Sequence, residues 1–123
     1  MKRPTNRQRL LAGALLLALF VSLLGCGDVN SDARRICTLW SEMANSGKVP
    51  LAQRPTVAVG IFRKQWFSSK TKRCVGLLDS PGVPGDVKFA AFEGCMHDAG
   101  ATGWSCEPMR AHYNMKAAGV PGN

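Results

Sequence analysis

An uninterrupted apolar run divides this chain into two parts of different character. Residues 10–25 contain only Leu, Ala, Gly, Phe, Val and one Ser, and the residues before them carry Lys2, Arg3, Arg7 and Arg9 with no acid. Positive charges ahead of a short apolar segment are typical of an export signal. Because spanning the hydrocarbon core takes about 20 apolar residues, this shorter run is more typical of a signal peptide than of a permanent membrane anchor. Only the chain beyond it is therefore expected to fold as a domain.

The apolar run ends in Leu23-Leu24-Gly25-Cys26. This tetrapeptide resembles the lipobox of bacterial lipoprotein precursors, with Leu23 as the large aliphatic residue, Gly25 as the small residue before the cut and Cys26 as the modified cysteine. Leu24 departs from the small residue usual at its position. The resemblance implies that residues 1–25 are a signal peptide, that the Cys26 thiol receives diacylglycerol, and that its new amino group receives an acyl chain such as palmitate. The alternative is a free or disulfide-bonded Cys26 after an uncleaved anchor.

The residue after the cysteine bears on localisation. In the lipoprotein family an Asp at this position usually retains the protein in the inner membrane, but here Gly27 holds it and Asp28 follows. The resemblance therefore implies lipid anchoring at the periplasmic face of the outer membrane, with the inner membrane as the alternative. The expected organisation is then a tether over residues 26–30, a small exported domain over 31–118 and a flexible tail over 119–123.

The cysteine count agrees with lipidation. Five cysteines are an odd number for an exported protein, but modification of Cys26 leaves Cys37, Cys74, Cys95 and Cys106 as candidates for two disulfides. In an oxidising periplasm each bridge would contribute about 2 to 4 kcal/mol. Spacing alone allows three pairings. We favour Cys37 with Cys95 and Cys74 with Cys106, and pairing of Cys95 with Cys106 stays open.

The hydrophobic patterns predict an α+β domain with two main helices and a β-hairpin. Ser31 is expected to cap a helix over 32–44, and a second helix is expected over 86–98 with Val87, Ala90, Ala91 and Cys95 along its inner side. A last short helix is predicted over 107–118. The β-formers from Thr56 predict a strand running toward Phe67, a turn over 68–71 and a returning strand over 72–78. Because Ala58, Phe62 and Trp66 also fit a helical face, a mainly α fold is the alternative.

Net charge argues against nucleic acid as a partner. The sequence has sixteen Lys and Arg residues and eight Asp and Glu residues, but four of the cations lie in residues 1–9. Residues 26–123 thus carry twelve cations and eight acids, a net charge of +4. This mild excess is not typical of a nucleic-acid-binding domain.

The predicted hairpin nevertheless concentrates positive charge. Residues 63–73 contain five cations, Trp66, Phe67 and no acid. The simplest interpretation is a solvated hairpin end with Trp66 or Phe67 in the core. The functional interpretation is a contact with anionic lipid, lipopolysaccharide or an acidic envelope protein. Its candidate residues are Arg63, Lys64, Lys70, Lys72 and Arg73.

Recognised catalytic motifs are not found in the sequence. His97 is expected on a helix surface and His112 at the protein surface. A metal site formed by these histidines with Cys95 and Cys106 lacks zinc-finger spacing, so neither a metal nor a cofactor is expected. The predicted function is therefore non-catalytic: a lipid-anchored envelope protein that acts as a binding, scaffolding or exclusion factor. The alternatives are a small envelope enzyme or enzyme inhibitor, and a structural tether or a component of a secretion or conjugation apparatus.

Overall fold

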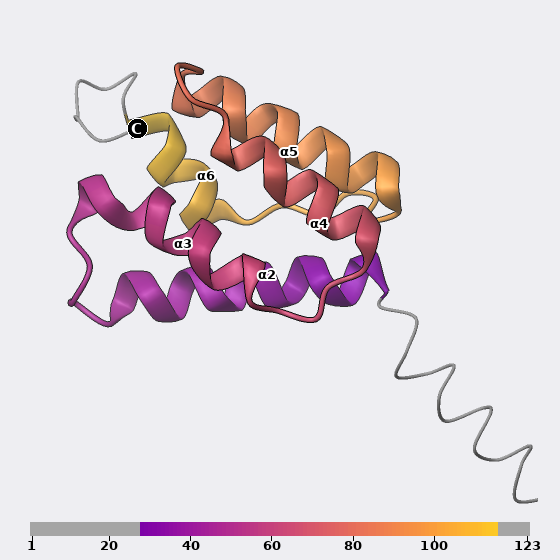
Figure 1. Ribbon diagram of the computed structural model, residues 1–123, viewed down its shortest axis with the longest axis horizontal. Coiled ribbons are helices and arrows are strands. Elements are labelled where there is room, and N and C mark those ends of the chain that lie inside the picture. Colours follow the sequence, from indigo (N-terminus) through magenta and orange to yellow (C-terminus); the bar gives the residue numbers. More distant parts are fainter. Residues whose placement is uncertain (1–27, 116–123) are drawn as a thin grey trace, which may run out of the picture.

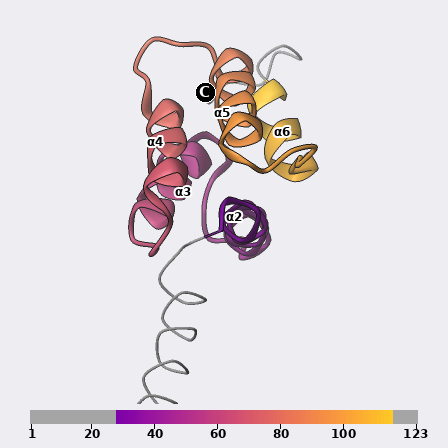
Figure 2. The ribbon, with the colours of Figure 1, turned by 90° about the vertical axis from the view of Figure 1, so that its right-hand side faces the viewer.

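Helix α2 (Val29–Asn45) is the element against which the other α-helices pack. The computed structural model describes residues 28–115, so Cys26, the predicted signal peptide and the predicted tail lie outside the described residues. Viewed along α2, helices α3 and α4 lie to its upper left, α5 lies above it and α6 lies to its upper right (Figure 2). The remaining elements are η1 (Leu51–Gln53), α3 (Arg54–Arg63), α4 (Ser69–Gly76), η2 (Leu77–Asp79), α5 (Gly85–Ala99) and α6 (Glu107–Asn114).

The fold is mainly α, which corrects the prediction of an α+β domain with a β-hairpin. Residues 28–115 contain no strand, and both predicted strands are helical. Pro55 lies in the first turn of α3, where its fixed φ suits a helix and its missing N–H costs nothing. Ala58, Val59 and Phe62 then form the buried face of α3. Burial of this face overrides the strand preference of its β-branched residues, so the mainly α alternative is confirmed.

Helix α4 replaces the predicted turn and returning strand. Ser68 is its N-cap, and the Ser68 Oγ accepts a hydrogen bond of 3.3 Å from the backbone N–H of Thr71. Thr71, Cys74 and Val75 point into the core with helical spacing. The Ser68 cap and the helical spacing of these buried residues outweigh the β-propensity that favoured a strand.

The predicted helices over 32–44, 86–98 and 107–118 correspond to α2, α5 and α6, and residues 116–118 lie outside the described residues. Two details differ. The N-cap of α2 is Asp28, whose Oδ1 accepts a hydrogen bond of 3.2 Å from the N–H of Asn30, and not Ser31. The inner side of α5 is formed by Phe89, Phe92 and Met96, whereas the predicted Val87 is 52% exposed.

The core is centred on Trp40 of α2, which is 1% exposed. Its ring centroid lies 5.2 Å from that of His112 and 5.8 Å from that of Tyr113, both on α6. Tyr113 in turn stacks on Phe89 of α5 with centroids 5.7 Å apart. These ring contacts join three helices into one core.

The order of the helices brings four helix ends together at one end of the bundle. In Figure 1, α2 and α4 begin, and α3 and α5 end, toward the right-hand side. The loop over residues 64–68 crosses beside α2 at this end to connect α3 with α4. The start of the described chain therefore lies beside the loop over residues 64–68, which we call the Trp66 loop.

Candidate functional site

The loop between α3 and α4 is held on both sides of Trp66. Before it, the Gln65 side-chain amide donates a hydrogen bond of 3.1 Å to the Ile61 carbonyl. After it, Phe67 is 7% exposed and belongs to the core. The prediction that one of the two aromatic residues lies in the core is thus met by Phe67.

Asp32 fixes the end of this loop to α2. Its buried carboxylate accepts a hydrogen bond of 3.0 Å from the Ser68 backbone N–H and one of 2.6 Å from the Thr71 hydroxyl, both to Oδ2. A buried charge is costly unless it is hydrogen-bonded, and bonds to a carboxylate are stronger than neutral ones. Asp32 also lies in the first turn of α2, where the helix dipole favours negative charge.

Trp66 projects from this fixed loop with 97% of its side chain exposed. A large aromatic side chain removes much apolar area from water when a partner covers it, and tryptophan is enriched at interfaces. A shallow open groove of about 470 Å³ lies between Trp66 and α2. Besides the buried Asp32 and Phe67, the groove is lined by Ser31, Arg34, Arg35, Thr38, Gln65 and Trp66, which together we call the Trp66 surface.

Arg34 and Arg35 were not among the predicted contact residues. Both are exposed on the second turn of α2, and neither forms an ion pair with any residue in the 28–115 range. They were missed because they are distant in sequence from the 63–73 cluster. The buried Asp32, three residues before Arg35 in a predicted helix, gave no sequence signal that the two segments meet.

The predicted cationic cluster is divided by the helical structure. Arg63 is paired with Asp79 at 2.6 Å, and both side chains are more than half exposed, so the pair adds little stability. Lys70 and Arg73 line one pocket beside Asp98, whereas Lys72 faces another beside Arg63. Lys64 remains exposed in the loop beside Trp66. The five cations therefore do not form one patch on a hairpin.

Both disulfides are present, but with a pairing that differs from the favoured one. Cys37 of α2 is bonded to Cys106 at the start of α6, and Cys74 of α4 is bonded to Cys95 of α5. The prediction paired α2 with α5, whereas α5 presents Cys95 toward α4 because Phe89, Phe92 and Met96 form its core face. The two bridges thus link the four helices α2, α4, α5 and α6 in pairs.

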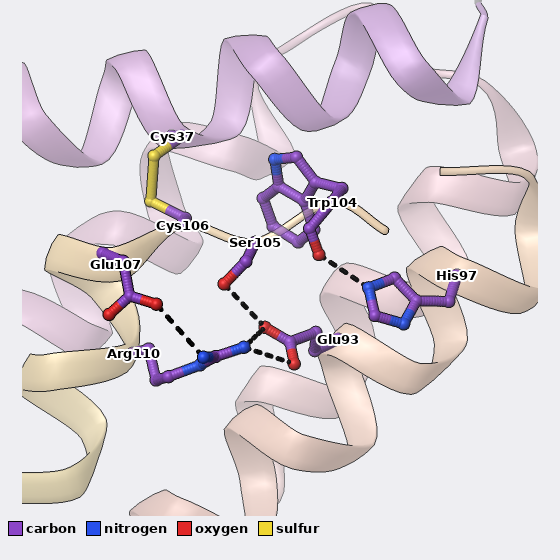
Figure 3. A network of polar contacts seen from close by, with 8 residues as sticks. All are labelled: Cys37, Glu93, His97, Trp104, Ser105, Cys106, Glu107 and Arg110. Atoms are coloured by element: carbon purple, nitrogen blue, oxygen red, sulfur yellow. Dashed lines mark hydrogen bonds and ion pairs between the residues drawn. A yellow bond between two sulfur atoms is a disulfide. The ribbon is translucent and has the colours of Figure 1, made fainter. Parts of the chain in front are cut away.

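A polar network connects α5 with α6 (Figure 3). Arg110 donates hydrogen bonds of 2.8 and 2.7 Å to the two carboxylate oxygens of Glu93, and one of 3.1 Å to Glu107. The hydrogen bonds and charge of Glu93 raise the pKa of Arg110 above its usual value. Ser105 donates to Glu93, and His97 Nε2 lies 2.6 Å from the Trp104 carbonyl, to which it can only donate. These contacts fix the connection beside the Cys37–Cys106 bridge.

The two histidines have structural environments that differ from each other. His97 is bound to the Trp104 carbonyl, whereas His112 is buried against Trp40, which corrects its predicted surface position. Burial, with a smaller contribution from the charge of Arg54, lowers the pKa of His112. Burial raises the pKa of the neighbouring Tyr113.

The hypothetical metal set is not assembled by this fold. Cys95 and Cys106 belong to different disulfides, and their sulfurs are not available as thiolate ligands. Within residues 28–115, no three His, Cys, Asp or Glu side chains are grouped as a metal site would need.

Comparisons with protein-family models, curated proteins and solved structures find no match for this chain. Among the helices that the structure describes, none has the length and apolar character needed to cross a membrane.

Proposed function

We propose that this chain is a lipid-anchored protein of the bacterial cell envelope that binds a partner through the Trp66 surface and has no catalytic role. The anchor is the diacylglyceryl group on Cys26, and the expected location is the periplasmic face of the outer membrane. The candidate partners are anionic lipid, lipopolysaccharide and an envelope protein.

One observation carries the proposed binding role: Trp66 is 97% exposed between two residues that are held in place. Gln65 is hydrogen-bonded and Phe67 is in the core, so the exposure of Trp66 belongs to an ordered segment. Binding at an ordered segment loses less conformational entropy than binding at a mobile one. Arg34 and Arg35 beside it favour a partner that carries negative charge.

The ionisable groups with shifted pKa values serve packing. His112 and Tyr113 lie in the aromatic core, and Arg110 is tied to Glu93. None of these three groups lines the groove of the Trp66 surface, which supports binding over catalysis at that surface.

Intact mass tests the anchor. We expect protein extracted from membranes to have the mass of residues 26–123 plus diacylglyceryl and acyl groups. Alkylation should modify four thiols only after reduction, since both bridges are formed. A mass of the unmodified full chain would contradict the anchor.

Photocrosslinking in cells tests the surface. A photoreactive phenylalanine analogue is placed at position 66, and the matched control carries it at Val87, which is apolar, exposed and near the start of α5 at the opposite end of the bundle. We expect a specific adduct, with protein or with lipid, from position 66 and none from position 87. Equal yields at the two positions would contradict a binding role for the Trp66 surface.

A further inference from the structure

We infer that the partner of the Trp66 surface is the anionic phospholipid of the membrane that carries the anchor, with the Trp66 indole at the level of the headgroups. This inference rests on the proposed function and identifies the partner class. It also sets the orientation of the domain, because the end of the bundle where α2 and α4 begin would face the bilayer.

Chain length places this end of the domain at the membrane. Cys26 is two residues before Asp28, so their Cα atoms are separated by at most about 7 Å. The Asp32 hydrogen bonds to Ser68 and Thr71 hold the Trp66 loop against the first turn of α2. A lipid on Cys26 would therefore keep the Trp66 surface close to the headgroups.

The composition of the Trp66 surface suits a headgroup layer. An indole ring has an apolar body and a polar N–H, and tryptophan is enriched at membrane interfaces for that reason. Guanidinium groups bind phosphate oxygens through paired hydrogen bonds, and Arg34 and Arg35 have no ion-pair partner within residues 28–115. Cations close to an anionic leaflet are attracted by its negative surface potential.

Charges of both signs lie at this end of the bundle. Asp32 is buried and engaged by two hydrogen bonds, and the Asp28 carboxylate accepts from the N-terminal turn of α2. Lys64 and Lys70 flank the loop that carries Trp66. With Arg34 and Arg35 they make four cations, against the three acids Asp28, Asp32 and Asp98, the last of which lines a pocket with Lys70 near the end of α5. The net charge therefore favours an anionic surface.

The surroundings of Trp66 favour lipid over a protein partner. Protein interfaces have an apolar centre within a polar rim, whereas the other members of the Trp66 surface are polar or charged. A tryptophan in the wall of a preformed ligand pocket would be partly buried, whereas Trp66 is almost wholly exposed to solvent. One projecting indole among cations matches the chemistry of interfacial membrane contacts.

The test uses tryptophan fluorescence of the mature protein reconstituted in phospholipid vesicles. Trp40 is buried and Trp104 partly buried, so collisional quenching by acrylamide reports mainly on Trp66, and a Trp66→Phe variant defines its share. The vesicles contain phosphatidylcholine alone or with phosphatidylglycerol. We expect the Trp66 share of the acrylamide quenching to fall several-fold in the anionic vesicles, and brominated lipids to quench Trp66 there.

Charge variants decide the role of the arginines. Arg34→Glu combined with Arg35→Glu should restore acrylamide access to Trp66, while the protein stays attached through its lipid. The control variant combines Lys48→Glu, after the C-terminus of α2, with Lys88→Glu, in the first turn of α5. It makes the same charge change at the end of the bundle away from Trp66 and should leave Trp66 protected. Protection lost equally in both variants would overturn the specific contact.

Failure of this inference is distinguishable from failure of the proposed function. If the intact mass confirms the lipid but Trp66 stays open to acrylamide in anionic vesicles, the inference is wrong and the anchor stands. If protection requires an added envelope protein, the partner is a protein and the inference is equally wrong. If the lipid is missing, the anchor is wrong, and cosedimentation of the unlipidated protein with the same vesicles decides whether Trp66 binds them.

Discussion

Asp32 in the first turn of α2 accepts a hydrogen bond of 2.6 Å from the hydroxyl of Thr71 in the first turn of α4. The two residues are 39 positions apart in the sequence. The same carboxylate oxygen accepts from the backbone N–H of Ser68, the N-cap of α4. One buried side chain thus determines where the Trp66 loop ends and how it lies against α2.

Asp32→Ala is expected to lower the free energy of unfolding by about 2 to 3 kcal/mol, because hydrogen bonds to a charged group are lost and the Ser68 N–H is left without its acceptor. Asp32→Asn keeps a carbonyl acceptor and should cost less. Glu42→Gln, on an exposed position of the same helix, is the control and should change stability little. Urea unfolding followed by circular dichroism measures all three. An equal effect of Asp32→Ala and Glu42→Gln would contradict this role of Asp32.

The two disulfides are expected to contribute unequally to stability. The Cys37–Cys106 bond closes a loop between residues 69 positions apart, and the Cys74–Cys95 bond closes a loop between residues 21 positions apart. Loop-entropy theory gives about 4.4 kcal/mol for the longer loop and about 3.3 kcal/mol for the shorter. Replacing each pair by two alanines should therefore lower the unfolding free energy more for the Cys37 pair. Chemical denaturation of both double variants measures the difference, and a larger loss for the Cys74 pair would contradict it.

The helices that the sequence predicted well are those with a strong 3.6-residue pattern. In α2, Ala33, Ile36, Trp40 and Met43 follow one another at intervals of three or four residues and are buried as a stripe. In α3, the β-branched residues at 56, 57 and 59 suggested a strand, and only the packing of Ala58, Val59 and Phe62 against neighbouring helices decides for a helix. Local propensity is a weak guide where tertiary contacts oppose it.

The candidate site could be predicted only in part. The segment with Trp66 was identified from its charge and aromatic content, but Arg34 and Arg35 come from another helix. Their proximity depends on the buried hydrogen bonds of Asp32, which no local pattern reveals. The pairing of the cysteines was unpredictable for the same reason, because it depends on which face each helix turns to its neighbours.

The free energy of unfolding should fall as the pH is lowered through the range in which His112 gains a proton in the unfolded chain. Burial and the charge of Arg54 lower the pKa of His112 in the folded protein below the usual 6.5. Below about pH 6.5 the unfolded chain therefore binds more protons than the folded one, so the unfolding free energy decreases. We expect His112→Phe, which keeps an aromatic ring against Trp40, to flatten this dependence between pH 7 and pH 5.

His97→Gln is the comparison variant, because it removes the other histidine of the chain. Urea unfolding of the wild type and of both variants across the pH range separates the two contributions. A slope that His97→Gln removes and His112→Phe retains would contradict the assignment to His112.

Trp66 and Phe67 are adjacent aromatic residues with opposite roles, and substituting each in turn separates binding from stability. Phe67 is 7% exposed, so Phe67→Ala should lower the unfolding free energy by about 3 to 5 kcal/mol. Trp66 is 97% exposed, so Trp66→Ala should change it by no more than about 0.5 kcal/mol while lowering the cosedimentation of the unlipidated protein with anionic vesicles. Because the variants differ by one position in the same loop, a loss of binding in Trp66→Ala without a loss of stability can only reflect the contact itself. Destabilisation by Trp66→Ala would instead show that the indole packs on the protein.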